Sequence, residues 1–408
     1  MTADLTGLKR QIVITVIGPG EISSWLYPFV KVLKETSPQT RINVCILPSI
    51  FGTGSETTVL GSMPDVDSVA SIKETKKLIF RGKFPEGFKK GLPGCVLHFG
   101  GEPLLSKWLA ARFHYPVVFY GEEIPSIRFL FNKIFLTAEK TSNKRKGKIA
   151  PLGNLMVDAV QMRCPRQREG KTGFMTVGIF PGSRYYMAKE FLPFFMKVAR
   201  YVSASIEDIR WIFAKSDYLS IDEIKKIIQT GNEILRDGER ACFKMDETSP
   251  FLVSESGVRF DILRPEEVLT QADAALTIPG TNTAELAIRG IPMIVMLPSQ
   301  RIELYPFPGP IGHLNKIPVI GKHIKIALLL QYFKKVKYLA WPNKLAQRKI
   351  VPEIKGKITS KDIAREFTSY IQKPLQHVSE ELRSVMGTGG AARRLVSEIL
   401  NVVESRFE

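Results

Sequence analysis

Short apolar runs of strand length recur along the chain, and each gives way to a turn or to a segment with helical periodicity. The runs expected to form strands are residues 12–17, 42–47, 95–99, 117–120, 175–180, 209–214, 274–278 and 293–297. Helical patterns cover residues 23–34, 188–202 and 283–289. Buried strands that alternate with helices form mainly parallel sheets covered on both faces. The pattern therefore predicts an α/β fold with two doubly wound, Rossmann-like halves.

The length of 408 residues is enough for two or three domains, and polar segments indicate where they divide. Residues 141–148 (TSNKRKGK) and 163–171 (RCPRQREGK) are rich in charge, and the strand–helix pattern restarts after the second segment. We expect Rossmann-like domains over 1–168 and 169–358, and C-terminal helices over 359–408 that pack back across the domains. The carboxyl ends of both sheets would then face a ligand cleft.

The chain carries 58 lysine and arginine residues against 40 aspartate and glutamate residues, which gives a formal net charge of +18. Such an excess favours polyanionic partners. The basic residues are interleaved with large apolar ones, and no zinc-finger, helix–turn–helix or aromatic RNA-binding signature is present. We therefore expect no nucleic acid partner and favour an anionic membrane surface or a phosphate-bearing ligand.

Composition also limits the class of protein. Hydrophobic residues make up 44% of the chain, which is typical of a globular protein and excludes a disordered one. No apolar run approaches the roughly 20 residues that span a bilayer, and the first apolar stretch runs into Gly-Pro-Gly, unlike a signal peptide. The four cysteines are widely spaced without a CxxC pair. We expect a soluble, intracellular chain whose reduced cysteines pack as small apolar residues.

Two stretches combine basic residues with aromatic and aliphatic ones. The first, residues 76–90 (KKLIFRGKFPEGFKK), has six basic residues beside Leu78, Ile79, Phe80, Phe84 and Phe88. The second covers residues 306–338 and includes IKIALLLQYF at 324–333. Basic heads beside apolar bodies suit an anionic membrane interface. The alternative is a solvated basic face over a buried helix.

A glycine turn follows each of two predicted strands in the second half. Pro181-Gly182-Ser183-Arg184 follows the run 175–180, and residues 279–285 (PGTNTAE) follow the run 274–278. Backbone N–H groups at a helix start can face a diphosphate, Arg184 offers a planar cation, and Glu285 can accept hydrogen bonds from ribose. A plain turn and a capping box are the alternatives for the first and second loops. Together the two loops favour a nucleotide diphosphate at the carboxyl edge of the sheet.

The chain as a whole resembles the lipid A disaccharide synthase family, which are glycosyltransferases of the two-domain GT-B architecture. The segments that carry the resemblance are Gly20-Glu21, Gly100 to Glu102, Gly153 to Asp158, Phe180 to Arg184, Gly280 to Glu285, Pro292 to Val295, Trp341 to Arg348 with Glu353, and Gly387 to Ile399. They extend over most of the chain. Order and spacing agree best in the second half.

The resemblance implies an inverting, metal-independent hexosyltransferase that moves a glucosamine-type sugar from a UDP donor to a lipid-linked sugar acceptor. The UDP-sugar is then a substrate, and no cofactor is expected. The residues implied at the donor site are Ser183 and Arg184 at the diphosphate, Gly280, Thr281 and Thr283 at the adjoining helix start, Glu285 at the ribose, and Asn343 and Arg348 near donor or acceptor. The enzyme would be cytoplasmic and peripheral to the inner membrane. The sequence leaves the oligomeric state open, a homodimer included.

The first half departs from the family pattern at two places. The family motif Gly-Glu-Ala-Ser-Gly-Asp is here Gly20-Glu-Ile-Ser-Ser-Trp25, and the place of the family's catalytic aspartate is taken by Glu102 after Gly101. Glu102 keeps a carboxylate for general-base work on the acceptor hydroxyl. Other candidates for this role are Glu21, Glu122 and Glu123, while we expect His98 to be a core residue.

Two other functions stay open. A UDP-sugar 2-epimerase shares the architecture and needs no acceptor. A non-catalytic lipid- or nucleotide-binding descendant of the fold would account for the altered motifs of the first half.

Overall fold

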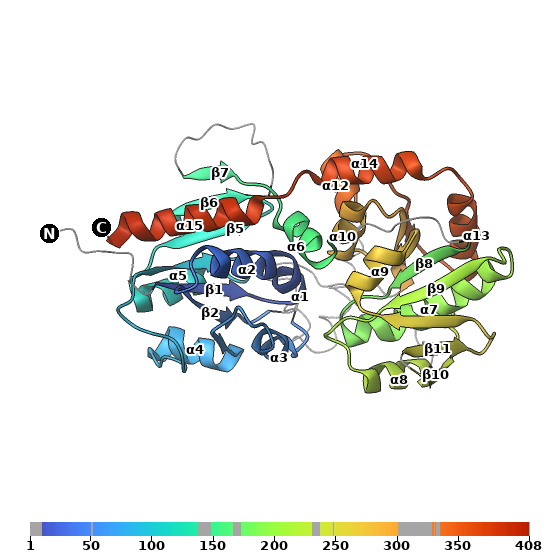
Figure 1. The fold of residues 1–408 in the computed structure, drawn as a ribbon, viewed down its shortest axis with the longest axis horizontal. Helices are drawn as coiled ribbons and strands as arrows, with labels where there is room; N and C mark the ends of the chain where they lie inside the picture. Colours follow the sequence, from blue (N-terminus) through green and yellow to red (C-terminus); the bar gives the residue numbers. More distant parts are fainter. Residues whose placement is uncertain are drawn as a thin grey trace. The chain divides into compact units, whose positions relative to one another are not determined.

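The structure, a computed structural model, describes residues 10–49, 52–137, 148–165, 173–230, 237–247, 249–300, 329, 331 and 335–407. The chain divides into two compact units, residues 1–162 with 387–408, and residues 163–386 (Figure 1). Most of the two polar segments at 141–148 and 163–171, and most of the basic apolar stretch at 306–338, lie outside the described residues.

The first unit is built on a seven-stranded sheet whose neighbouring strands all run parallel. The strand order is β3-β2-β1-β4-β5-β6-β7, so the direction of winding reverses between β1 and β4. The strands are β1 (Gln11–Val16), β2 (Arg41–Ile46), β3 (Ser68–Ala70), β4 (Gly94–His98), β5 (Val117–Gly121), β6 (Lys133–Leu136) and β7 (Ile149–Pro151).

Helices cover this first sheet, and the last one comes from the far end of the chain. They are α1 (Pro19–Glu21), the π-helix η2 (Ile22–Leu26), α2 (Tyr27–Thr36), α3 (Glu56–Gly61), α4 (Ile72–Arg81), α5 (Pro103–Phe113), the 3-10 helix η3 (Arg128–Leu130), α6 (Leu155–Arg163) and α15 (Ala391–Phe407). α15 packs against α2 and β4. The carboxylate of Asp158 accepts hydrogen bonds from the backbone N–H groups of Gly390 (2.5 Å) and Ala392 (3.2 Å) and so fixes the start of α15.

The second unit has an eight-stranded sheet of order β10-β11-β12-β9-β8-β13-β14-β15. β11 pairs antiparallel with β10 and with β12, and the remaining pairs are parallel. The strands are β8 (Met175–Phe180), β9 (Ile209–Ala214), β10 (Ala241–Met245), β11 (Pro250–Ser254), β12 (Arg259–Leu263), β13 (Ala274–Thr277), β14 (Met293–Pro298) and β15 (Glu353–Gly356). The antiparallel edge is an addition that the apolar runs did not predict.

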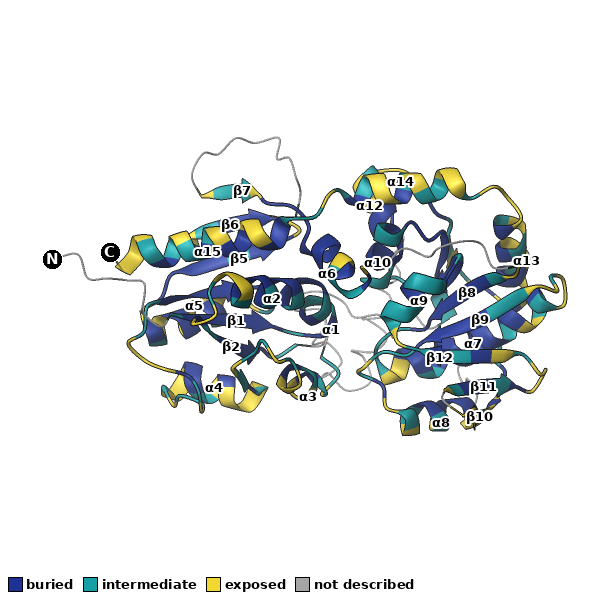
Figure 2. Cartoon of the chain, viewed as in Figure 1, coloured by how far each residue is buried: buried dark blue, intermediate teal, exposed yellow. Residues whose placement is uncertain are grey.

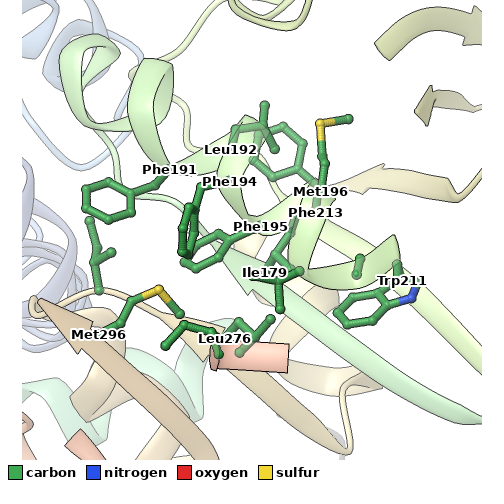
Figure 3. Packing of buried hydrophobic residues seen from close by; sticks show 14 of the residues in the cluster. Ile179, Phe191, Leu192, Phe194, Phe195, Met196, Trp211, Phe213, Leu276 and Met296 are labelled. Carbon is green, nitrogen blue, oxygen red and sulfur yellow. The ribbon is translucent and has the colours of Figure 1, made fainter. Parts of the chain in front are cut away.

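The core of the second unit lies between this sheet and α7 (Figure 3). Phe191, Phe194 and Phe195 follow one another at helical spacing on α7, and each is fully buried. The helices of this unit are α7 (Tyr185–Ser203), α8 (Ile221–Thr230), α9 (Pro265–Gln271), α10 (Asn282–Arg289), α12 (Trp341–Ala346), α13 (Ser360–Ile371) and α14 (Gln376–Met386). The expected α/β class, with two doubly wound parallel-dominated sheets, is therefore confirmed.

The tail expected as one segment over 359–408 is divided in the structure. α13 packs against α7, and α14 packs against α10 and α12, so both belong to the second unit. Only α15 belongs to the first unit, and the glycines at 387 and 390, which both have positive φ, separate it from α14. Among the helices of the described residues, none has the length and apolar character needed to cross a bilayer.

Candidate functional site

The two glycine loops of the second unit lie side by side at the carboxyl edge of its sheet. β8 and β13 are parallel neighbours with Thr277 opposite Phe180, so the loops leave adjacent strand ends. Gly182 has φ +103°, and a Cβ atom there would lie 3.0 Å from Cδ1 of Ile278 in the other loop. The winding of the sheet reverses between these strands, which is where doubly wound sheets bind ligands.

Both loops end in the N-terminus of a helix. α7 starts after Arg184 and α10 after Thr281, and neither capping residue makes a side-chain cap bond. The first backbone bond at α10 runs from Thr283 N to Gly280 O at 3.1 Å, so the N–H groups of Thr281 and Asn282 have no acceptor within the described residues. Free N–H groups and the helix dipole favour an anion at such a place. The capping-box alternative is wrong for this loop, because Glu285 bonds elsewhere.

Glu285 is held by an arginine that the sequence did not single out. Nη2 of Arg163 donates to Oε1 of Glu285 at 2.9 Å, and its Nη1 donates to Glu266 at 3.3 Å. Burial works to lower the pKa of Arg163, but the two carboxylates outweigh it and raise that pKa above its ordinary value. A ribose at this position would therefore have to use Oε2 of Glu285.

Thr283 and Asn343 have structural roles. The hydroxyl of Thr283 donates to Gly280 O at 2.8 Å and accepts from Trp341 N at 3.1 Å, and the residue is fully buried. Asn343, also fully buried, donates to Val351 O and Glu353 Oε1, both at 2.9 Å, and accepts from the N–H groups of Ile350 and Val351. The hydrogen-bonding groups of these two side chains are therefore used inside the protein.

Among the expected site residues at this edge, Gly280 is exposed, and Ser183, Arg184 and Thr281 are partly open to solvent. Arg184 lies close enough to Tyr186 to oppose the increase that burial causes in the pKa of that phenol. Arg348, in contrast, is an exposed residue whose guanidinium pairs with Glu381 on α14. The structure therefore brings the two glycine loops together, while Arg348 belongs to the surface between α12 and α14.

A corresponding edge exists in the first unit, where the winding reverses between β1 and β4. A Cβ atom at Gly100 would lie 3.1 Å from Cγ1 of Ile17 and 3.4 Å from Cγ of Glu21. Gly101 has φ +99°, and a Cβ there would lie 2.6 Å from Leu47. Glu102 follows this tight turn and lies just before α5. Its side chain is exposed and makes no cap bond.

Trp25 is buried in an aromatic cluster of the first unit. It lies in the π-helix η2 and packs against Phe99 and Tyr120, with ring centroids 6.1 and 5.4 Å away. Its indole Nε1 is buried and has no hydrogen-bond partner within the described residues. The polar aspartate that the family pattern has at this place is thus replaced by part of an aromatic core.

His98 is a core residue, as expected. It is 3% exposed, stacks on Phe119, and has Nδ1 2.8 Å from the hydroxyl of Ser106. Burial lowers its pKa to about 3, so the imidazole is neutral at physiological pH. It therefore lacks the basicity that general-base catalysis needs.

The sequence patterns did not single out Glu56, a buried carboxylate near this edge. Glu56, 3% exposed, accepts hydrogen bonds from the hydroxyl of Thr53 at 2.9 Å and from Gly54 N at 2.9 Å. It fixes the loop that follows β2, so it has a structural role. The chain also has one Asp-x-Asp sequence, Asp65 to Asp67, but Asp67 precedes β3 at the opposite edge and pairs with Lys34 at 2.8 Å.

Metal-ligating residues and thiols do not gather at either edge. Over the described ranges, no group of three or more histidine, cysteine, aspartate or glutamate side chains could hold a metal ion. Cys45, Cys95 and Cys164 are buried, and burial raises the pKa of Cys45 to about 12. Cys242 is exposed on β10, so the expectation that all four cysteines are packed is wrong for this one.

The first basic apolar stretch, residues 76–90, is less apolar at its surface than its sequence implies. Leu78, Ile79 and Phe88 are buried, and Phe84 packs against the same core. Phe80 is 57% exposed. The stretch is thus mostly the polar outer face of a buried helix, with one exposed aromatic ring.

Comparison with solved structures defines the class of fold. The chain is similar to a putative UDP-N-acetylglucosamine 2-epimerase from Listeria monocytogenes, with a TM-score of 0.54 and 12% identity over 98% of this chain and 97% of that one. It is also similar to UDP-GlcNAc 2-epimerase from Neisseria meningitidis bound to UDP-GlcNAc, with a TM-score of 0.53 and 11% identity over 96% and 100%. These likenesses show the GT-B type of α/β fold found in UDP-sugar enzymes.

Sequence comparison indicates relatives of a more particular kind. The chain is 24% identical over 259 residues to lipid-A-disaccharide synthase of Trichlorobacter lovleyi, which covers 62% of this chain and 57% of that protein. It is 25% identical over 241 residues to lipid-A-disaccharide synthase of Geobacter sulfurreducens, which covers 57% and 50%. The matches therefore span little more than half the length of these relatives. No protein-family profile matches the chain.

Proposed function

We propose that this chain is an inverting glycosyltransferase that uses a UDP-sugar donor and a lipid-linked acceptor. The observation that carries the proposal is the pair of glycine loops at the reversal point between β8 and β13, each leading into a helix N-terminus. The similarity to lipid-A-disaccharide synthases supports a glucosamine-type sugar and a lipid acceptor at an anionic, cytoplasmic membrane face.

The donor would bind the second unit. The N–H groups of Thr281 and Asn282 and the side chains of Ser183 and Arg184 would hold the diphosphate. Oε2 of Glu285 would accept from a ribose hydroxyl while Oε1 stays bonded to Arg163. Because Arg184 and two helix N-termini can offset the charge that grows on the leaving UDP, the reaction needs no metal in this proposal.

The acceptor would bind the first unit, where Glu102 acts as general base. Its carboxylate takes the proton of the acceptor hydroxyl as that oxygen bonds to the anomeric carbon. The bond between the anomeric carbon and the diphosphate oxygen breaks, and its electron pair leaves with UDP. Attack from the side opposite UDP inverts the anomeric centre.

The test is UDP release from several UDP-sugars, measured with and without lipid-linked sugar acceptors. We expect release only when an acceptor is present. UDP binding without turnover on any acceptor would contradict the transferase and favour a non-catalytic binding protein.

A second candidate is a UDP-sugar 2-epimerase, because solved structures of that activity share the fold over nearly the whole chain. Incubation with UDP-GlcNAc alone separates the two functions. The C2-epimer appears without any acceptor if the chain is an epimerase, and it does not form if the chain is a transferase.

A further inference from the structure

Arg163, the first residue of the second unit, bridges the two helices that follow β12 and β13. Its Nη2 donates to Oε1 of Glu285 in the first turn of α10 at 2.9 Å, and its Nη1 donates to Oε1 of Glu266 in the first turn of α9 at 3.3 Å. Both helices are buried or half-buried over their whole length (Figure 2). The side chains of Arg163 and Glu285 are only 15% and 10% exposed, so their ion pair lies largely away from solvent.

The chain directly after Arg163 is anchored to the same two helices. Nη1 of Arg289, in the last turn of α10, donates to Cys164 O at 3.1 Å, and its Nε donates to Leu269 O at 3.3 Å. The thiol of Cys164 donates to Glu266 O at 3.6 Å. Because the backbone beside it is held at these points, Arg163 presents its guanidinium to Glu285 from a fixed base.

One oxygen of the Glu285 carboxylate is left over in this arrangement. Oε1 accepts from Arg163. Oε2 makes no hydrogen bond within the described residues and is not one of their unpartnered buried polar atoms, so a ligand can reach it. The ion pair thus fixes the carboxylate through one oxygen and leaves the other as an acceptor for a hydroxyl group.

Arg163 also offsets the repulsion between its two acidic partners. Carboxylates that share one site disfavour each other's charged form unless a cation lies between them. Burial works to lower the pKa of Arg163, but Glu285 and Glu266 together raise that pKa above its ordinary value, so the guanidinium stays charged. Without this cation, Glu285 would turn away from Glu266 and lose its present orientation.

We propose that Arg163 is a positioning residue, which holds Glu285 so that Oε2 selects a ribonucleoside diphosphate over the analogue without ribose hydroxyls. The inference rests on the proposed function, which places the ribose of the donor at Glu285. Arg163 does not touch the nucleotide in this arrangement and acts through Glu285. A carboxylate that is already held in one orientation binds a hydroxyl group more tightly, because less side-chain freedom is lost on binding.

Calorimetry with UDP and with 2′,3′-dideoxy-UDP, which lacks both ribose hydroxyls, tests this role. We expect the wild type to bind UDP at least about tenfold more tightly than the dideoxy nucleotide, since a hydrogen bond to a charged group is lost. In Arg163→Gln this preference should fall below about threefold, while affinity for the dideoxy nucleotide stays unchanged. A preference like that of the wild type would overturn the proposal. So would equal weakening of both nucleotides, which is the effect of a residue that only supports the fold.

Two further variants control for damage to the fold. Arg163→Lys keeps the charge without the planar fork and should retain part of the preference for UDP, which keeps the test open if Arg163→Gln does not fold. Arg210→Gln is the matched control, because it breaks an ion pair of the same kind on β9, from Nη2 of Arg210 to Asp261 at 2.7 Å. It should lower stability and leave the preference as it is. Loss of the preference in Arg210→Gln would overturn the specific role of Arg163.

The background Glu285→Gln tests whether Arg163 acts through Glu285. In this background we expect Arg163→Gln to change the preference for UDP by less than about twofold, because the group that it positions is already altered. A larger change would overturn the proposal, since Arg163 would then act on the nucleotide by another route.

The wild-type chain separates this inference from the proposed function. If it binds neither UDP nor the dideoxy nucleotide, the donor site is contradicted, and the inference fails with it. If it binds UDP with a preference that survives in Arg163→Gln, the donor site stands and only the role of Arg163 is contradicted.

Discussion

In the second unit, the segments that follow β8 and β13 carry hydroxyl groups and Arg184, whereas in the first unit the segments that follow β1 and β4 carry Glu21 and Glu102. In both units adjacent parallel strands are followed by glycines, but the glycine with positive φ follows β8 in the second unit (Gly182) and β4 in the first (Gly101). The side chains differ in charge. The comparison teaches that one topology can place a cation and hydroxyl groups at the edge of one sheet and carboxylates at the edge of the other.

The largest expected effect concerns the acidic edge. Glu102→Gln keeps size and hydrogen bonding but removes basicity, so we expect turnover to fall by about 10²–10⁴-fold while UDP affinity measured by calorimetry stays unchanged. Glu102→Asp should keep part of the activity. Glu35→Gln is the control, because Glu35 is an exposed acid in the last turn of α2. Normal turnover by Glu102→Gln would move the search for the base to Glu21 and Glu122.

Substitution of Asn343 tests whether this residue stabilises the fold of the second unit or binds the ligand. Asn343→Ala leaves the N–H groups of Ile350 and Val351 without their acceptor. It also removes one of the donors to Oε1 of Glu353, which keeps its bonds from the N–H groups of Leu339 and Ala340. We expect the free energy of unfolding to fall by about 2–4 kcal/mol, measured by urea denaturation, with UDP affinity of the folded protein retained. Arg348→Ala, an exposed change in the same segment, should cost under about 0.5 kcal/mol. Equal stability of both variants would contradict the structural role.

Substitution of Arg184 tests the diphosphate site that we propose at the edge of the second sheet. Arg184→Ala removes a charge-assisted contact to the diphosphate, so we expect UDP binding to weaken by about 1.5–3 kcal/mol in calorimetry. Arg200→Ala changes an exposed arginine at the other end of α7 and should leave UDP affinity as it is. If both variants bind UDP like the wild type, the donor site lies elsewhere.

His98 gives the first unit a dependence on pH. Between pH 6.5 and its folded pKa of about 3, the folded chain keeps His98 neutral while the unfolded chain binds a proton, so acid favours unfolding. We expect the wild type to lose about 1.4 kcal/mol of stability per pH unit below pH 6.5 relative to His98→Gln. Urea denaturation at pH 7 and pH 5 measures the difference. His377→Gln, an exposed control, should keep the wild-type slope, and an unchanged slope in His98→Gln would refute the linkage.

The smallest expected effect is that of removing divalent cations. Because charge on the leaving UDP is offset by Arg184 and two helix N-termini in our proposal, excess EDTA should change turnover by less than about twofold. A loss of activity that Mg²⁺ restores would show that the basic edge needs a metal.

Much of the fold could be predicted from the sequence, because buried parallel strands are apolar along their whole length. All eight apolar runs form strands. As expected, a glycine turn and then a helix follow each of the runs that end at residues 180 and 278. Seven strands of the described residues were not predicted: β3, β6, β7, β10, β11, β12 and β15. β10 is largely exposed, so its sequence does not carry the continuous apolar signal.

The roles of the candidate residues were harder to predict than the strands. Threonine and asparagine are residue types that often contact a bound ligand, which is why Thr283 and Asn343 were expected at the site. In the structure both are fully buried, and their side chains bond to the protein backbone. Arg163 lies far from Glu285 in the sequence, so the ion pair between them has no local signature.

The sequence by itself determined the strands, the glycine turns and the residue types at each edge, because these depend on local periodicity and on the backbone freedom of glycine. Only the tertiary structure decided which side chains stay available for a ligand. Burial and long-range hydrogen bonds, such as those of Asn343, His98 and Arg163, depend on contacts between segments far apart in the chain. The sheet order that sets two loops side by side is likewise a property of the folded chain, because strand neighbours are chosen by packing rather than by position in the sequence.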